Sequence, residues 1–176
     1  MKDEIILVDE KDNQISTGEK MTVHKEGKLH RAFSVFIFNS KDELMLQQRA
    51  KIKYHSPGLW TNTCCSHPKP GEKTEDAAKR RLREEMGFSC DLKEAFSFVY
   101  KAKFDNGLSE HEFDHVFIGK FDGNPKPDKK EAENWKWISF SELKKDMKRN
   151  PDNYTCWLKV SIDKLISYLE SKKAFS

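Results

Sequence analysis

Residues 66–88 read SHPKPGEKTEDAAKRRLREEMGF, and this stretch decides the fold. It predicts a helix over residues 75–86, because alanine, leucine and methionine recur there every four residues and form one apolar face. Thr74 is placed to cap the start of this helix. Gly87 is placed to end it, since glycine readily takes the left-handed conformation that follows many helices. Strand-like segments are expected on both sides of this helix.

The acidic residues Glu84 and Glu85 stand in the last turn of the predicted helix, where the helix dipole is negative. Anions at such a position cost about 0.3–1 kcal/mol each. Ion pairs with Arg80 and Arg81 on a charged surface face are one explanation, although the acid-before-base order that favours such pairs is reversed here. The other explanation is a divalent cation at the helix end that binds these carboxylates.

The spacing resembles the Nudix box, G-x5-E-x7-R-E-U-x-E-E-x-G-U, in which U is a bulky apolar residue. The positions that fall on this spacing are Ser66, Glu72, Arg80, Leu82, Glu84, Glu85, Gly87 and Phe88. In this family the loop–helix–loop binds a divalent metal on a diphosphate. Ser66 departs mildly from the first glycine. Arg81 replaces the glutamate that in Nudix hydrolases usually binds metal or serves the attacking water, and a permanent cation can do neither. The resemblance implies a metal–diphosphate holder with impaired hydrolysis.

Length and composition narrow the class of protein. A chain of 176 residues fits a single domain. Its 32 basic and 29 acidic residues are interleaved, with a net charge of only +3, which argues against a nucleic-acid partner. The apolar run near the start, residues 5–8, is too short for a signal peptide or a membrane span. We therefore expect a cytoplasmic protein with no membrane partner and, for lack of a long apolar surface stripe, a monomer.

The remaining elements follow from apolar patterning. Residues 32–38 are continuously apolar, as in a strand buried on both faces, and residues 43–49 read as its hairpin partner. Asn106-Gly107 predicts a second hairpin. Further strands are expected at 4–9, 95–104, 110–121 and 135–138, and further helices at 140–148 and 156–170. These elements predict an α+β fold, an α/β/α sandwich whose mixed β-sheet is flanked by helices in a single domain spanning residues 1–176. Its core would cover about 30–140 and its C-terminal helical cover about 140–172.

Three histidines and two glutamates form a second candidate metal site: His24, His30, His67, Glu110 and Glu112. Alternate residues of a strand project to one face, about 6.5–7 Å apart, so Glu110 and Glu112 could share a cation while His111 points away. Such a set suits zinc, manganese or iron, and its carboxylates favour manganese or magnesium. Single histidines are more often packed or exposed residues than ligands, and we interpret His55 and His115 in that way.

Residues 61–68, TNTCCSHP, place two cysteines just before His67. A disulfide, a metal site and a reacting thiol are all possible functions for such a cluster. Reduced cysteines are expected inside the cell, and no C-x-x-C pair is present in the sequence. A mixed-ligand metal site or a reactive thiol therefore remains.

Four segments together resemble the type I isopentenyl-diphosphate delta-isomerases, which have a Nudix fold but do not hydrolyse. They are EKMTVH (19–24), LHRAFSVFIFN (29–39), PGLWTNTCCSHP (57–68) and LSEHE (108–112). The resemblance runs from about residue 3 to 160. It implies an isomerase of isoprenoid biosynthesis that interconverts isopentenyl and dimethylallyl diphosphates through a tertiary carbocation. The alternatives are a Nudix-type hydrolase of a diphosphate-containing metabolite and a non-catalytic metal-binding domain.

The resemblance also implies roles for individual residues. Cys65 corresponds to the proton donor and Glu112 to the carboxylate that faces it, whereas Cys64 falls on a variable position suited to packing. The five-residue His/Glu site would hold Mn²⁺ or Zn²⁺, and Glu85 would bind Mg²⁺ on the substrate diphosphate. Cations that match diphosphate-binding positions are Lys20, Arg49 and Lys53. Aromatic residues that would face the carbocation are Trp157, with Tyr100 and Trp60 completing the wall.

Overall fold

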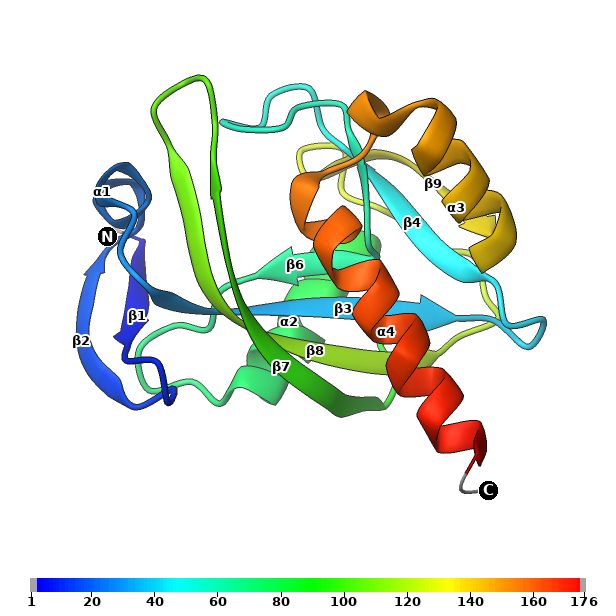
Figure 1. The fold of residues 1–176 in the computed structure, drawn as a ribbon, viewed down its shortest axis with the longest axis horizontal. Helices are drawn as coiled ribbons and strands as arrows, with labels where there is room; N and C mark the ends of the chain where they lie inside the picture. The colour runs from blue at the N-terminus through cyan, green and yellow to red at the C-terminus, as the bar shows by residue number, and fades with distance from the viewer. Residues whose placement is uncertain (1–2, 175–176) are drawn as a thin grey trace.

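The structure is a computed structural model that describes residues 3–174. Its elements, in chain order, are β1 (Glu4–Val8), β2 (Gln14–Glu19), α1 (Lys20–Glu26), β3 (His30–Phe38), β4 (Leu44–Arg49), β5 (Trp60–Thr61), β6 (Cys64–Ser66), α2 (Thr74–Met86), β7 (Leu92–Lys103), β8 (Ser109–Lys120), β9 (Ala132–Ile138), α3 (Phe140–Arg149), the 3₁₀ turn η1 (Pro151–Asn153) and α4 (Cys156–Ala174). All nine strands belong to one curled, mixed sheet (Figure 1).

Strand β3 is the centre of the sheet. It pairs in parallel with β8 along its whole length, from His30 beside Glu112 to Phe38 beside Lys120. On its other side it pairs antiparallel with β6, which places Ser34 opposite Cys65. Segments that lie far apart in the sequence are thereby held next to one another.

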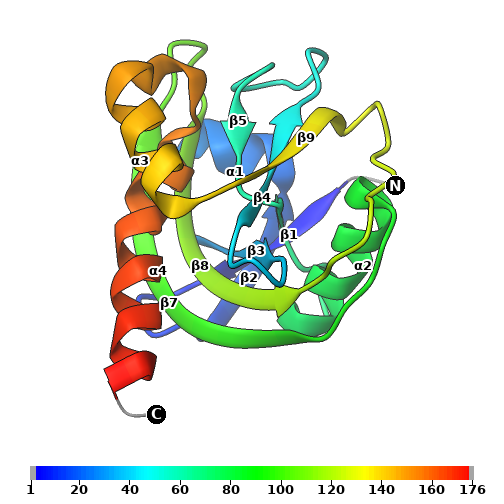
Figure 2. The same cartoon turned by 90° about the vertical axis from the view of Figure 1, so that its right-hand side faces the viewer.

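Helices cover both faces of the sheet. One core cluster joins Phe33, Val35 and Ile37 of β3 to α2, and the other joins Phe36 and Phe38 to α3 and α4. Alternate residues of a strand point to opposite faces, so a strand covered on both sides must be apolar throughout. Figure 2 shows α2 on one side of the sheet and the C-terminal helices on the other. The predicted single-domain sandwich of helices around a mixed sheet is confirmed.

Helix α2 differs from expectation at its start. Thr74 is its first helical residue, and the capping position belongs to Lys73, whose side chain makes no capping hydrogen bond. The predicted cap at Thr74 is therefore wrong by one position. The predicted end is confirmed, because Gly87 has a φ of 74° and its N–H donates to the carbonyl of Arg83.

The strand pairing refines one further expectation. Strand β4 pairs antiparallel with β3 at Leu44 opposite Phe38, as predicted for residues 43–49, but its long partner is β9. Residues 61–68 contain the end of β5 and all of β6. The hairpin at Asn106-Gly107 is confirmed by the pairing of β7 with β8.

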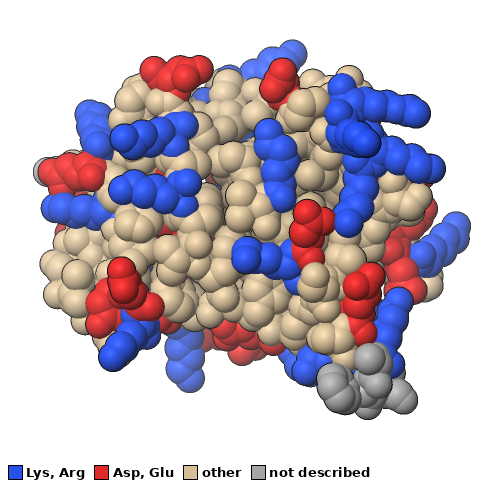
Figure 3. Space-filling model, in the orientation of Figure 1, with Lys and Arg blue, Asp and Glu red and all other residues tan. Residues whose placement is uncertain are grey.

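The surface carries acidic and basic side chains side by side (Figure 3). Within the described residues, no helix has the length and apolar character needed to cross a membrane.

Candidate active site

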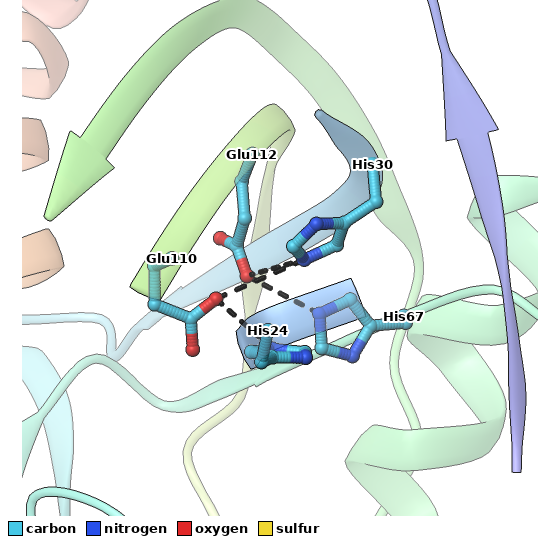
Figure 4. A group of neighbouring side chains, drawn as sticks. All are labelled: His24, His30, His67, Glu110 and Glu112. Carbon is cyan, nitrogen blue, oxygen red and sulfur yellow. Dashed lines mark hydrogen bonds and ion pairs between the residues drawn. The ribbon is translucent and has the colours of Figure 1, made fainter. Parts of the chain in front are cut away.

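Five predicted metal ligands meet in one buried cluster (Figure 4). His24 comes from α1, His30 opens β3, and His67 follows β6. Glu110 and Glu112 are alternate residues of β8, so both side chains point to the same face. The ligand atoms of all five residues lie within 4.8 Å of one another.

Each carboxylate presents one oxygen to the histidines. Oε2 of Glu110 is 3.2 Å from Nε2 of His24 and 3.8 Å from Nε2 of His30. Oε1 of Glu112 is 3.2 Å from Nε2 of His67 and 3.7 Å from Nε2 of His30. The two oxygens and the three ring nitrogens therefore converge on one small volume.

The cluster has the properties of a divalent-metal site. His24 Nε2, His30 Nε2 and Glu110 Oε2 are buried and make no hydrogen bond to any described residue. Buried polar atoms without partners are rare because each one costs free energy. Imidazole nitrogens and carboxylate oxygens are ligands that manganese and zinc accept. The donor set and its unsatisfied atoms thus fit a divalent metal ion.

Burial and charge shift the pKa values of the cluster in opposite directions. Burial and repulsion by Glu112 raise the pKa of Glu110 to about 7. Burial also opposes ionisation of Glu112, but contacts with His30 and His67 outweigh it and hold the pKa of that carboxyl well below its usual range. Burial lowers the pKa of His67 to about 3. Burial opposes protonation of His24 as well, but Glu110 outweighs it and raises the pKa of this ring. Glu112 and His67 are therefore in the charge states that metal binding needs.

The adjacent cysteines point to different environments. Cys64 is fully buried in the core cluster beneath α2, opposite Val35 of β3. Cys65, the next residue of β6, projects to the other face and lines a pocket. Burial raises the pKa of the Cys65 thiol well above its usual range, and the nearby carboxylates add to the shift. The thiol is thus protonated at neutral pH.

Cys65 and Glu112 line the same pocket. Cys65 pairs with Ser34 and Glu112 with His30, and residues 30 and 34 of β3 point to the same face. The hydroxyl of Tyr100 lies in this pocket too and donates a 2.6 Å hydrogen bond to Oε2 of Glu112. Strand register therefore brings a thiol and a carboxylate from distant segments to one cavity.

The three predicted diphosphate-binding cations line this pocket together with Glu85. Oε2 of Glu85 accepts a hydrogen bond from Gln47 at 2.9 Å, and Oε1 accepts one from Arg81 at 2.8 Å. Arg81 also donates to Glu131 at 3.0 Å. Mg²⁺ is commonly held by one or two carboxylates plus substrate phosphates, so a single glutamate beside a cationic pocket fits it. Arg81, the residue that departs from the Nudix box, thus holds the Glu85 carboxylate in place by a hydrogen bond.

Aromatic side chains form the remaining wall. Trp157 of α4 lines the pocket, and the guanidinium carbon of Arg49 lies 5.1 Å from its ring centroid. Trp60 does not border the pocket; it packs against the core cluster beneath α3 and α4, with Lys136 over its ring. Its predicted place in the wall is wrong. Trp60 pairs with Gln48, the neighbour of the pocket residue Arg49 in β4, so its side chain points to the face of the sheet away from Arg49.

His55, interpreted from sequence as an ordinary histidine, belongs to the site. It lines the pocket, is only 5% exposed and places Nε2 2.9 Å from Oε1 of Glu110. Burial, with Arg49 nearby, lowers its pKa to about 3. No spacing or motif identifies it, because its partner lies on a distant strand. His115 is an ordinary histidine as predicted, paired with Asp12 and Glu94 away from the pocket.

Curated proteins of similar sequence share one description. The chain is 56% identical to isopentenyl-diphosphate Delta-isomerase 2 of Aromatoleum aromaticum over 167 residues, which cover 95% of this chain and 88% of that protein. It is 52% identical to isopentenyl-diphosphate Delta-isomerase of Serratia proteamaculans, with 89% of this chain and 88% of that protein covered.

A domain match and two solved structures identify the fold. The NUDIX domain model matches residues 28–158. A solved structure from Deinococcus radiodurans (DR0079) superposes with a TM-score of 0.77 at 19% identity and covers 92% of this chain and 98% of its own. A MutT NUDIX hydrolase from Burkholderia pseudomallei superposes with a TM-score of 0.62 at 17% identity and covers 77% of this chain and 97% of its own; at such identities the likeness concerns the fold alone. By its domain and its curated relatives, the chain belongs to the isopentenyl-diphosphate Delta-isomerases of the NUDIX domain family.

Proposed function

We propose that this isomerase interconverts isopentenyl and dimethylallyl diphosphates with Cys65 and Glu112 as its two proton-transfer groups. The Cys65 S–H would donate its proton to the terminal methylene carbon, C4. The electron pair of the C3–C4 double bond would form the new C–H bond. The positive charge would then lie on C3. Loss of a proton from C2 to the Glu112 carboxylate returns that C–H electron pair to a new C2–C3 double bond. No bond to phosphorus breaks in either proton-transfer step.

The observation that carries this proposal is the shared pocket of Cys65 and Glu112. Their charge states support the two roles, since a thiol of raised pKa keeps its proton and a carboxyl of lowered pKa is ionised to accept one. Trp157 and Tyr100 border the same space. An aromatic face stabilises a nearby desolvated cation by about 2 kcal/mol, which suits a tertiary carbocation.

The diphosphate would bind to the cationic side chains that line the pocket. Lys20, Arg49 and Lys53 carry charges opposite to the phosphates. We place Mg²⁺ at Glu85, where it would neutralise part of the diphosphate charge. When the diphosphate is bound in this way, the five-carbon tail would lie against Cys65, Glu112 and the aromatic side chains of the pocket.

The His/Glu cluster would hold Mn²⁺ or Zn²⁺ through His24, His30, His67, Glu110 and Glu112. When bound, this dication favours the ionised form of Glu112. Tyr100 holds the other oxygen of Glu112 by its hydrogen bond. Together these contacts orient the carboxylate toward the substrate and keep it ready to accept a proton.

Proton NMR of isopentenyl diphosphate in deuterated water with added Mg²⁺ tests the function directly. We expect dimethylallyl diphosphate to form with deuterium in one methyl group, because C4 takes its proton from an exchangeable S–H. Metal-stripped protein is the control. Inorganic phosphate release instead, from this substrate or from a panel of nucleoside diphosphate derivatives, would identify a hydrolase and refute the isomerase.

Light scattering during gel filtration tests the accompanying proposal of a monomer.

A further inference from the structure

His55 is held rigidly although it comes from the segment between β4 and β5. Its ring stacks on Phe104, with centroids 4.8 Å apart and planes 7° from parallel. Trp157 and Tyr54 meet the ring edge-on at 5.5 and 4.5 Å. Three aromatic side chains from different parts of the chain thus fix where the imidazole nitrogens point.

The ring points at the metal cluster. Nε2 of His55 lies 2.9 Å from Oε1 of Glu110, the oxygen that does not face the histidine ligands. Glu112 shows the same arrangement: its Oε1 faces His67 and its Oε2 accepts the hydrogen bond of Tyr100. Each carboxylate therefore has one oxygen directed at the cluster and one held by a donor outside it.

The hydrogen-bond pattern defines which nitrogen of His55 carries the proton. Nδ1 is buried and makes no hydrogen bond within residues 3–174. With metal bound, Glu110 is an ionised carboxylate that only accepts, so the contact of its Oε1 with His55 requires N–H on Nε2. A neutral imidazole with its hydrogen on Nε2 satisfies the carboxylate and leaves the bare nitrogen among aromatic rings.

We propose that His55 is a positioning residue of the metal centre, which holds Oε1 of Glu110 so that this carboxylate binds the metal through Oε2 alone. The proposal rests on the part of the proposed function that puts a metal on the His/Glu cluster. Groups that hydrogen-bond metal ligands orient them and raise metal affinity, commonly by 10- to 100-fold. His55 does for Glu110 what Tyr100 does for Glu112.

Two variants separate the hydrogen bond from the packing. His55→Phe keeps a ring to stack on Phe104 and removes the donor. His55→Gln removes the ring but brings an amide N–H to nearly the position of Nε2. The full-length chain is stripped of metal, and Mn²⁺ affinity is measured by competition with a chromophoric chelator, with circular dichroism to verify folding. We expect His55→Phe to weaken Mn²⁺ binding by about 10- to 100-fold and His55→Gln to restore it to within a few-fold of the original chain.

The opposite order of affinities, with His55→Phe unchanged and His55→Gln weakened, would show that His55 acts through packing and would overturn the proposal. Equal losses in both folded variants would overturn it too. A readout free of substitutions is the ¹⁵N NMR spectrum of histidine-labelled protein with Zn²⁺ bound. There we expect His55 to carry its hydrogen on Nε2, and a ring protonated on Nδ1 contradicts the proposal.

A failure of the role proposed for His55 can be distinguished from a failure of the proposed isomerase reaction. If the original chain binds Mn²⁺ tightly but gives no dimethylallyl diphosphate, the reaction fails while the order of affinities among the variants still decides the role of His55. If the reaction occurs and His55→Phe binds Mn²⁺ as the original chain does, only the role of His55 fails.

Discussion

Cys64 and Cys65 are neighbours in the chain with different environments, and the pleat of β6 is the cause. One side chain packs in the core beneath α2, and the other lines the pocket. A substitution at either position therefore reports on a different property of the molecule.

Cys65→Ser tests the proton donor. We expect isomerisation to fall by about 100- to 10,000-fold, the usual contribution of a positioned acid or base, because a serine hydroxyl is a poorer proton donor than a thiol. Mn²⁺ content should be unchanged, since Cys65 is not among the clustered ligands. Cys64→Ala is the matched control, with activity close to the original and a small loss of stability. Activity retained by Cys65→Ser, measured with labelled isopentenyl diphosphate, removes this thiol from the chemistry.

The raised pKa of Glu110 makes metal binding depend on pH. Burial and Glu112 bring this pKa to about 7, so the metal-free carboxyl is largely protonated below pH 7 and ionised above it. A metal must displace that proton. We expect Mn²⁺ affinity to weaken by at least about tenfold per pH unit as the pH falls below 7, because the ring of His24, whose pKa is also raised, must lose its proton as well. Competition titrations at pH 6, 7 and 8 measure this, and equal affinities at pH 6 and 7 would contradict it.

Most of the metal cluster could be predicted from sequence, whereas His55 could not. Glu110 and Glu112 share a face by simple alternation, and His67 adjoins the distinctive TNTCCSHP segment. His55 acts through a single contact with Glu110, which is distant in the chain. Such a contact leaves no periodicity or spacing, so only the folded chain shows it.

At the level of secondary structure, the end of α2 depends on the absence of a side chain. Gly87 has a φ of +74°, and a Cβ there would lie 2.4 Å from the carbonyl oxygen of Lys126. The backbone N–H of Lys126 donates to the carbonyl of Met86, so that segment closes over the helix end. Glycine is needed here both for the left-handed backbone and for the close approach.

Gly87→Ala should therefore destabilise the fold by more than about 2 kcal/mol, because it combines left-handed strain with a backbone collision. Gly71→Ala is the matched control. Its φ is +79° and a Cβ there meets nothing within 4 Å, so it should cost only about 1 kcal/mol. Urea unfolding of both variants gives the free energies of unfolding. Equal losses would mean that the collision with Lys126 has no energetic effect.

The elements that sequence patterning missed are short or exposed. Strand β2 carries no buried residue, and α1 has only seven residues, with Val23 and His24 buried. Strand β6 has three residues and is rich in polar and small side chains. Neither periodicity nor turn chemistry marks such elements. Strands β2 and β6 are instead held in place by pairing with β1 and β3.

Across the whole molecule, the metal cluster joins four separate parts of the chain. Its ligands come from α1, β3, the segment after β6, and β8. An unfolded chain cannot offer these ligands together, so a bound metal stabilises the folded state by mass action.

We expect Mn²⁺ at a hundredfold excess over its dissociation constant to raise the free energy of unfolding by about 2.7 kcal/mol, and chelation to reverse the gain. Thermal or denaturant unfolding with and without Mn²⁺ measures it. His67→Ala should lose most of the gain, whereas His115→Ala, which removes a histidine outside the cluster, should keep it. A gain that survives in His67→Ala would place the metal elsewhere.

The fold class was predictable from sequence because the strongest signals belong to the longest elements. The unbroken apolar run of β3 requires cover on both faces, and the structure provides it with α2 on one side and α3 and α4 on the other. The order of strands was not predictable in this way. The parallel pairing of β3 with β8 joins segments about eighty residues apart, and local patterning carries no record of it.

Arg81 has a consequence for how easily this scaffold could change its chemistry. Its guanidinium is bound to Glu84, Glu85 and Glu131. An Arg81→Glu reversal would place a fourth acid beside Glu84, Glu85 and Glu131 and remove the cation that pairs with all three. Mutual repulsion would penalise the altered protein before any hydrolytic benefit appeared. A change of this scaffold toward hydrolysis therefore requires more than the one substitution, because the added negative charge at this spot must also be neutralised.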